Sequence, residues 1–358
     1  MPLHRIAVIP GDGIGTEVIP AGLRVLHALQ QTEPGLEFEF ETFHWGSAFF
    51  RRTGRMMPAD GVDNLKGYDA IYFGAVGDPG IPDHITLWGL RLAICQGLDQ
   101  YANVRPTRIL PGITPPLAGL KAGDLDWVIV RENSEGEYAG VGGRAHKGLP
   151  EEVGMDVSIF TRTGVRRIMK FAFELARTRP RKLLTVVTKS NAQRHGMVMW
   201  DDIFEEVKAG YPDIATDKML VDAMTVRMVR DPKSLDTIVA TNLHADILSD
   251  LAAALSGSIG IAPTGNVDPE RRGPSMFEPI HGSAFDIMGQ GIANPLGSFW
   301  SAAMMLEHLG EARVATRLMN AIERVTASGK VLSRDLGGTA TTAQVTDAVI
   351  AAIEGANA

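Results

Sequence analysis

The sequence repeats one local pattern, in which a short apolar run ends in glycine or a polar residue. Runs of this kind lie at residues 5–10, 68–77, 125–132, 183–191 and 235–242. Such runs predict β-strands, and the segments between several of them carry apolar residues at helical spacing. Strands that alternate with helices predict an α/β fold with an open sheet, in which ligands bind outside the carboxyl ends of the strands.

The length of the chain favours more than one domain. It has 358 residues, of which 45% are hydrophobic and 22% charged. A single core rarely organises so long a chain, so we expect two α/β domains. The net charge of −7, without clusters of lysine and arginine, argues against nucleic acid and anionic membrane surfaces as partners. No apolar run approaches the roughly 20 residues that cross a bilayer.

The single cysteine and the first residues bear on the compartment. Cys95 is the only cysteine, which excludes an intramolecular disulfide and suits a reducing environment. Its neighbours are typical of a helix face, so we interpret it as a packing residue. The first residues enter a strand without the basic and apolar regions of a signal peptide. We expect a soluble, cytoplasmic protein.

A glycine-rich turn follows the first predicted strand. Gly11, Gly13 and Gly15 give the pattern GxGxG, and Thr16 stands where a Rossmann fingerprint needs its third glycine. The turn therefore does not predict an ordinary Rossmann site. Its glycines would still allow backbone to approach a ligand closely.

Asp246 and Asp250 lie four residues apart just after an apolar run, which places both on one face of a helix. Like charges at this spacing repel each other. Either the carboxylates are exposed and screened, or a cation lies between them. The spacing alone favours exposed carboxylates.

Cationic and acidic side chains collect near the predicted strand ends. Arg91 and Arg105 flank an apolar helix, and guanidinium groups bind carboxylates in a bidentate manner, so they suggest an anion clamp. Other polar residues at or beyond strand ends are Arg131, Tyr138, Lys189 and Asp222. With the aspartate pair, they describe a site for a small polyanion and a hard divalent cation, and no His/Cys cluster suggests zinc.

A series of ordered motifs covers nearly the whole chain: GDGIG, ANVRP, VRENSEGEY, TKSN, VDAM, NLHADILSD, FEPIHGSAFDI and ANP. In these motifs the chain resembles the β-decarboxylating hydroxyacid dehydrogenases, the family of isocitrate, isopropylmalate, tartrate and D-malate dehydrogenases. The resemblance implies a two-domain, non-Rossmann α/β fold of the isocitrate/isopropylmalate dehydrogenase type. Residues 1–104 with 258–358 would form the larger, cofactor-binding domain, and residues 105–257 the smaller domain with a dimerisation arm. It also implies a homodimer with shared active sites.

The resemblance assigns catalytic roles residue by residue. Arg91, Arg105 and Arg131 match the arginines that hold the malate-like part of the substrate. Lys189 matches a lysine that reaches across the dimer interface, and this lysine or a water it holds would take the hydroxyl proton when its pKa is lowered. Tyr138 matches the acid that protonates the enol left when CO2 departs.

Metal and cofactor positions follow from the same resemblance. Asp222 of the partner subunit would join Asp246 and Asp250 around Mg²⁺ or Mn²⁺. The residues expected at the nicotinamide cofactor are Gly74, Asn191, His281, Gly282, Ser283, Ala284, Asp286, Ile287 and Asn294. Asp286 would accept hydrogen bonds from ribose hydroxyls and repel a 2′-phosphate, which favours NAD over NADP. The alternative is that Asp286 only caps a loop.

The residues before Arg91 bear on the substrate. Ile85 and Leu87 stand where isocitrate enzymes place serine and asparagine, and cannot meet a third carboxylate. Leu87 suits an isopropylmalate enzyme, but the large Trp88 would fill the volume of an isopropyl group. The alternative is that Trp88 packs in the core.

The phenylalanine in HGSAF, together with DHITLWG and ICQG, looks most like the tartrate and D-malate dehydrogenase branch. We expect NAD-dependent oxidation of (R)-malate to pyruvate and CO2, of tartrate to oxaloglycolate, or of both. The alternatives are a 3-isopropylmalate dehydrogenase, a non-catalytic regulatory homologue and a metal-binding scaffold protein. The last two have little use for a complete set of catalytic residues and arginines.

Overall fold

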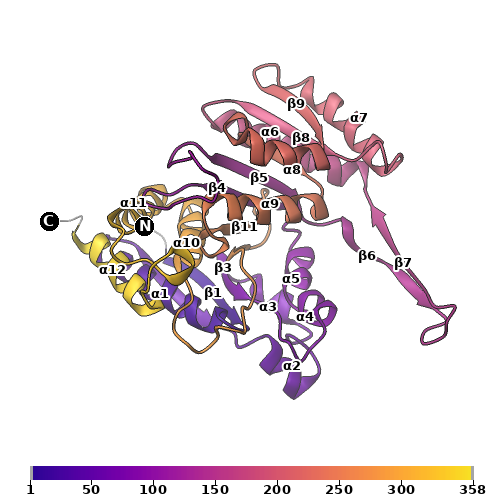
Figure 1. Ribbon diagram of the computed structural model, residues 1–358. Helices are drawn as coiled ribbons and strands as arrows, with labels where there is room; N and C mark the ends of the chain where they lie inside the picture. Colours follow the sequence, from indigo (N-terminus) through magenta and orange to yellow (C-terminus); the bar gives the residue numbers. More distant parts are fainter. Residues whose placement is uncertain (1–2, 356–358) are drawn as a thin grey trace.

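The computed structural model describes residues 3–355, which form one ten-stranded sheet with helices on both faces and a separate two-stranded hairpin (Figure 1). The strand order is β2-β1-β3-β12-β11-β4-β5-β10-β8-β9. The strands are β1 (Leu3–Gly11), β2 (Glu37–Thr42), β3 (Ala70–Ala75), β4 (Ala102–Arg108), β5 (Asp126–Glu132), β8 (Leu183–Thr188), β9 (Ala215–Leu220), β10 (Thr237–Ala240), β11 (Pro263–Val267) and β12 (Ser275–Pro279).

The sheet reverses direction in its centre. All pairings are parallel except β12 with β11, β11 with β4, and β4 with β5. The parallel strands at one end therefore run opposite to those at the other end. Carboxyl ends share an edge only within each half, because the two halves run in opposite directions. We expected one sheet edge at which all strands end and ligands bind. The sheet instead has two oppositely directed halves that meet at the antiparallel strands β11 and β4 in its centre.

Helices cover both faces of the half that contains β1, β2, β3 and β12. On one face, apolar side chains of the sheet pack against α1 (Gly15–Thr32), α10 (Leu296–His308), α11 (Ala312–Ser328) and α12 (Thr342–Glu354). On the other face are α2 (Ser47–Thr53), α3 (Gly61–Leu65), α4 (Asp83–Gly89) and α5 (Arg91–Gly97). Cys95 of α5 is buried in this second core, which fits its interpretation as a packing residue.

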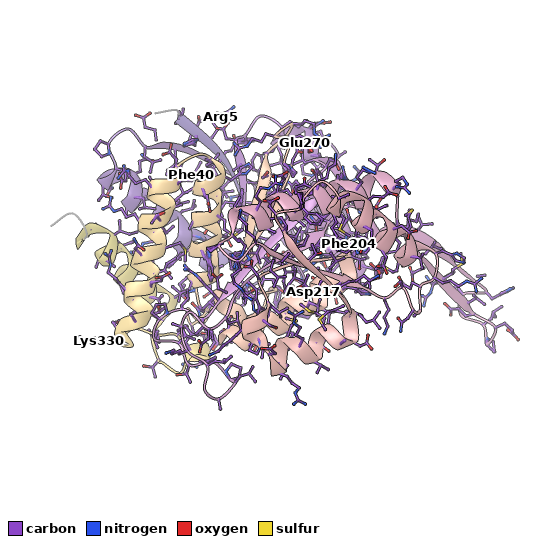
Figure 2. The ribbon with its side chains drawn as sticks, turned by 90° about the horizontal axis from the view of Figure 1, so that it is seen from above. Arg5, Phe40, Phe204, Asp217, Glu270 and Lys330 are labelled. Carbon is purple, nitrogen blue, oxygen red and sulfur yellow. The ribbon has the colours of Figure 1, made fainter. Side chains whose placement is uncertain are left out.

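The other half has two cores of its own. α6 (Arg162–Thr178) and α7 (Gly196–Lys208) pack on one face of β5, β8 and β10, and α8 (Val221–Arg230) and α9 (Asn242–Ser256) on the other. Short 3-10 turns lie at Pro232–Ser234, Ile259–Ile261 and Arg334–Leu336. Figure 2 shows Phe204 and Asp217 in this half, and Arg5, Phe40 and Lys330 in the other.

The hairpin of β6 (Gly136–Ala145) and β7 (Val153–Ile159) projects away from the rest of the molecule (Figures 1 and 2). Several of its apolar side chains are exposed: Val141, Leu149, Val153, Met155 and Val157. It lies within residues 105–257, the part of the chain in which a dimerisation arm is expected.

The predicted isocitrate/isopropylmalate dehydrogenase type of α/β fold is confirmed. The expected domain boundary at 104/105 falls within β4, a strand in the central junction, and the division into domains stays a prediction. No helix among residues 3–355 is long and apolar enough to cross a membrane.

The N-terminal glycine turn packs against protein rather than forming a Rossmann site. Gly13 has a φ of 55°, and a Cβ atom there would lie 1.9 Å from the carbonyl oxygen of Ser283. A side chain at this position is excluded, and the next residue, Ile14, donates its N–H to the same oxygen at 2.8 Å. The turn thus fixes the segment after β12 to the start of α1.

Candidate active site

A cavity of about 170 Å³ lies over the centre of the sheet, between the α4–α5 segment and α9. Its lining includes nine of the predicted site residues: Gly74, Leu87, Arg91, Arg105, Arg131, Tyr138, Asp246, His281 and Gly282. Side chains at alternate positions of a strand share one face of a sheet, and register places Arg131 opposite Asn103, two residues before Arg105. Strand pairing therefore brings together arginines that lie far apart in the sequence.

The three arginines are each held by a bond to their Nε atom. Arg91 Nε donates to Glu278 Oε1, Arg105 Nε to Asn103 Oδ1 and Arg131 Nε to Asn242 Oδ1, each at 2.8 Å. The bond at Nε fixes the plane of each guanidinium group, and the Nη1 atoms of Arg105 and Arg131 donate to Asp246 at the cavity. Within residues 3–355, the Nη2 atoms of these two arginines have no protein acceptor. Such groups are suited to carboxylate oxygens.

Asp246 faces these arginines from α9. Its Oδ1 accepts hydrogen bonds from Arg105, at 3.2 Å, and from Arg131, and its Oδ2 accepts from the Tyr138 hydroxyl at 3.1 Å. Burial opposes ionisation of Asp246, but the arginines, Arg131 most strongly, hold its pKa below the usual value. The carboxylate is therefore ionised at neutral pH.

Burial and the Asp246 charge raise the pKa of Tyr138, so its hydroxyl is protonated and able to donate. Burial and the neighbouring charge of Arg131 lower the pKa of Arg105 to about 9, which still leaves it charged near neutrality. For Arg91, Glu278 outweighs burial and raises the pKa. The buried cluster has three cations and only two carboxylates, Asp246 and Glu278, so an anionic ligand would balance it.

The predicted metal ligands are not gathered within one chain. Asp246 is half-buried at the cavity, and Asp250, one turn further along α9, is exposed. Asp222 lies at the start of α8, where Lys189 Nζ bonds its carboxylate at 2.7 Å and lowers its pKa. No cluster of three or more acidic, histidine or cysteine ligands occurs within the described residues. The oxygen donors fit a hard divalent cation, but one chain presents only the α9 pair, and a further donor has to come from elsewhere.

Predicted cofactor residues near the cavity have different surroundings. His281 lines the cavity, and its Nε2 atom is buried without a hydrogen-bond partner among the described residues, which leaves it available to a ligand. Burial lowers the pKa of His281, so the ring is neutral. Gly282 lines the cavity next to it, and Asp286 is exposed. These features fit a cofactor lying along this segment.

Other predicted cofactor residues hold the segment in place. Ala284 and Ile287 pack against the start of α1, and Ala284 has a φ of 41°, which is uncommon outside glycine. Asn294 Nδ2 donates to Asp335, and its Oδ1 accepts from the N–H of Leu296. Asn191 is exposed and lies in the other half of the molecule, after β8.

Leu87 and Trp88 differ in what they contact. Leu87 lines the cavity, whereas Trp88 does not. The Trp88 ring lies against Gly140 of β6, where a Cβ atom would be 2.7 Å from it. Trp88 is half-buried rather than part of the core, and it links α4 to the strand that carries Tyr138.

Several residues of the site were missed from the sequence. Glu278 forms a buried ion pair with Arg91 at 2.8 Å and lines the cavity. Thr264, Pro279 and Ile280 also line it. Of these, Glu278 could have been predicted from the sequence, because an acidic residue inside the short apolar segment MFEPI requires a buried partner.

The comparisons with known proteins agree with this geometry. The family model for isocitrate/isopropylmalate dehydrogenase matches residues 5–349, so the chain belongs to this family of decarboxylating dehydrogenases. The chain is similar to a solved isocitrate dehydrogenase from Methylococcus capsulatus, with a TM-score of 0.88 and 34% identity over 98% of this chain and 99% of that one.

Relatives with higher identity carry more specific names. A probable tartrate dehydrogenase/decarboxylase from Agrobacterium vitis is 71% identical over 354 residues, 99% of either chain. A tartrate dehydrogenase/decarboxylase from Pseudomonas putida is 50% identical, and a decarboxylating D-malate dehydrogenase from Escherichia coli K12 is 49% identical, each over 98% of both chains. The predicted family resemblance, with its tartrate and D-malate branch, is confirmed.

Proposed function

We propose that the chain oxidises a small 2-hydroxy dicarboxylic acid with NAD and a divalent metal, converting (R)-malate to pyruvate and CO2, tartrate to oxaloglycolate, or both. The observation that carries the proposal is the set of three buried arginines held at Nε and turned towards a small cavity beside Asp246 and Tyr138. This arrangement suits an acid with two carboxylates and a hydroxyl. The names of the similar proteins support the same substrate class.

Each of the predicted site residues would have a separate role in substrate binding or proton transfer. Arg91, Arg105 and Arg131 would bind the substrate carboxylates and fix the hydroxyl carbon within the cavity. Lys189 of the partner subunit, or a water that it holds, would take the hydroxyl proton. Tyr138 would protonate the enol carbon after CO2 leaves, and its raised pKa keeps the required proton in place near neutral pH.

Asp246 and Asp250, with Asp222 of the partner subunit, would hold Mn²⁺ or Mg²⁺. The segment from His281 to Asp286 would hold NAD, with Asp286 on the adenosine ribose. When bound, the metal would polarise the substrate oxygens and NAD would accept the hydride. If Asp246 held the metal, the terminal nitrogens of Arg105 and Arg131 that now donate to this carboxylate would be free to bind the substrate.

Exposed surfaces support a homodimer that completes the site. Val226 and Val229 of α8 and Ile247 of α9 are exposed apolar residues. They lie on the same two helices as Asp222 and the pair Asp246 and Asp250. Covering this surface with a second copy would stabilise the dimer and bring Lys189 and Asp222 of one chain towards Asp246 of the other.

The direct test records reduced nicotinamide by absorbance with NAD, Mn²⁺ and each of (R)-malate, the tartrates, 3-isopropylmalate and isocitrate, with CO2 release measured in parallel. Turnover of (R)-malate or a tartrate, with isocitrate inert, is expected. The second candidate is 3-isopropylmalate, which Leu87 in the cavity lining favours, and a preference for this acid would replace the proposal. No turnover of any acid would contradict both.

A further inference from the structure

Asn266, the last residue but one of β11, connects two of the substrate arginines through hydrogen bonds. Its side chain is fully buried and does not line the cavity. Its Oδ1 accepts from Arg91 Nη2 at 3.2 Å, Asn103 Nδ2 at 2.7 Å and Asn133 Nδ2 at 3.1 Å. Its Nδ2 donates to Glu278 Oε1 at 2.7 Å.

The orientation of these amides follows from their neighbours. Arg105 Nε can only donate, so the Oδ1 of Asn103 faces it and the Nδ2 of Asn103 faces Asn266. Glu278 is paired with Arg91 and therefore accepts, which places the Nδ2 of Asn266 towards it. Both constraints give the Asn266 amide the same orientation, in which its Oδ1 faces Arg91 Nη2 and Asn103 Nδ2.

Asn266 is thus connected to Arg91 twice and to Arg105 once. It bonds Arg91 directly and bonds Glu278, which holds Arg91 Nε. It reaches Arg105 through Asn103. Because these groups are buried, a change at Asn266 leaves donors unpaired or forces the arginines to move.

We propose that Asn266 is a positioning residue that fixes the spacing of Arg91 and Arg105, and so the placement of the substrate carboxylates. The inference rests on the proposed function, since it takes these arginines to bind the substrate. Loss of Asn266 weakens binding of the dicarboxylate in the ground state and the transition state alike, so it raises KM more than it lowers kcat.

Steady-state kinetics of Asn266→Ala with (R)-malate or tartrate test this role. We expect the KM for the acid to rise about tenfold, with kcat and the KM for NAD changing less than about threefold. Asn103→Ala removes the bonds to Arg105 and to Asn266 but leaves both connections between Asn266 and Arg91, so it should raise the same KM by a smaller factor. In the double variant, the rise in KM should be smaller than the product of the rises in the two single variants, because both residues belong to one hydrogen-bond network.

Gln100→Leu is the matched control. Gln100 is also fully buried and its amide donates to the carbonyl of Pro274, but it touches neither arginine. It should lower the melting temperature and leave the KM for the acid unchanged. An unchanged KM in Asn266→Ala, or an equal rise in Gln100→Leu, would overturn the inference. If Asn266→Ala does not fold, Asn103→Ala with a wild-type KM would also overturn it.

Failure of the proposed function would appear differently. Wild-type protein that oxidises none of these acids would contradict the function, while thermal unfolding in graded (R)-malate still tests Asn266. The inference would be supported if Asn266→Ala needed about tenfold more (R)-malate than the wild type for the same rise in melting temperature. The inference would be overturned if both proteins needed the same concentration of (R)-malate, or if (R)-malate did not raise the melting temperature of the wild type.

Discussion

The two sides of the candidate site differ in how completely one chain builds them. On the arginine side, the side chains of Arg91, Arg105, Arg131 and Glu278 are at most 10% exposed, and each has protein partners. On the lysine side, the Asp222 side chain is 67% exposed and that of Lys189 27% exposed, and they bond mainly each other. Buried charges need partners, and the arginine side finds them within the chain. The lysine side is left more exposed, as the proposed dimer with shared active sites would require.

The largest effect is expected where the two sides should meet. Asp246→Asn keeps the shape of the side chain but removes the charge that both arginines and the expected metal contact. Manganese-dependent turnover should fall about a thousandfold in a protein that stays folded at the assay temperature. The melting temperature should drop by a few degrees, because Arg105 and Arg131 lose their charged partner. Residual activity within about tenfold of wild type would show that the carboxylate is not a metal ligand.

Mixed dimers test whether the lysine side acts across an interface. Lys189→Ala and Asp246→Asn should each be inactive alone, because each spoils both sites of a homodimer. Unfolding and refolding the two together should restore about a quarter of the wild-type rate, since half of the dimers are mixed and each of these has one intact site. Activity no higher than that of the separate variants would place Lys189 and Asp246 in sites of the same chain.

A smaller effect is expected at the exposed cofactor segment. Asp286→Lys exchanges a carboxylate suited to ribose hydroxyls for a cation, and should raise the KM for NAD about tenfold without changing the KM for the acid. The melting temperature serves as the control, because Asp286 is exposed. An unchanged KM for NAD would show that Asp286 does not contact the cofactor and only caps a loop.

The smallest effect is expected at Trp88, which contacts β6 instead of lining the cavity. Trp88→Ala removes the contact with Gly140 and opens space between α4 and the strand that carries Tyr138. Activity toward 3-isopropylmalate should rise a few-fold and activity toward (R)-malate should fall, since a hydrophobic pocket discriminates modestly by volume. No gain with 3-isopropylmalate would rule out a steric role for Trp88.

The sequence predicted the fold class, the strands with continuous apolar runs and the helix that carries Asp246 and Asp250. It did not predict β4, β11 and β12, because buried polar residues interrupt the apolar pattern of these strands. Asn103, Asn266 and Glu278 lie on exactly those strands, so the part of the sheet most involved in the site is the part that least resembles a strand. Their roles depend on pairing between distant segments, which local patterns do not contain.

The strand order also governs how the chain is completed during synthesis. Residues 126–240 supply β5, β8, β9 and β10, so that end of the sheet is available before the last hundred residues leave the ribosome. The opposite end has to wait, because β12 is inserted between β3 and β11. Until residues 263–279 emerge, the edges of β3 and β4 that later pair with β12 and β11 stay open to pairing with other chains.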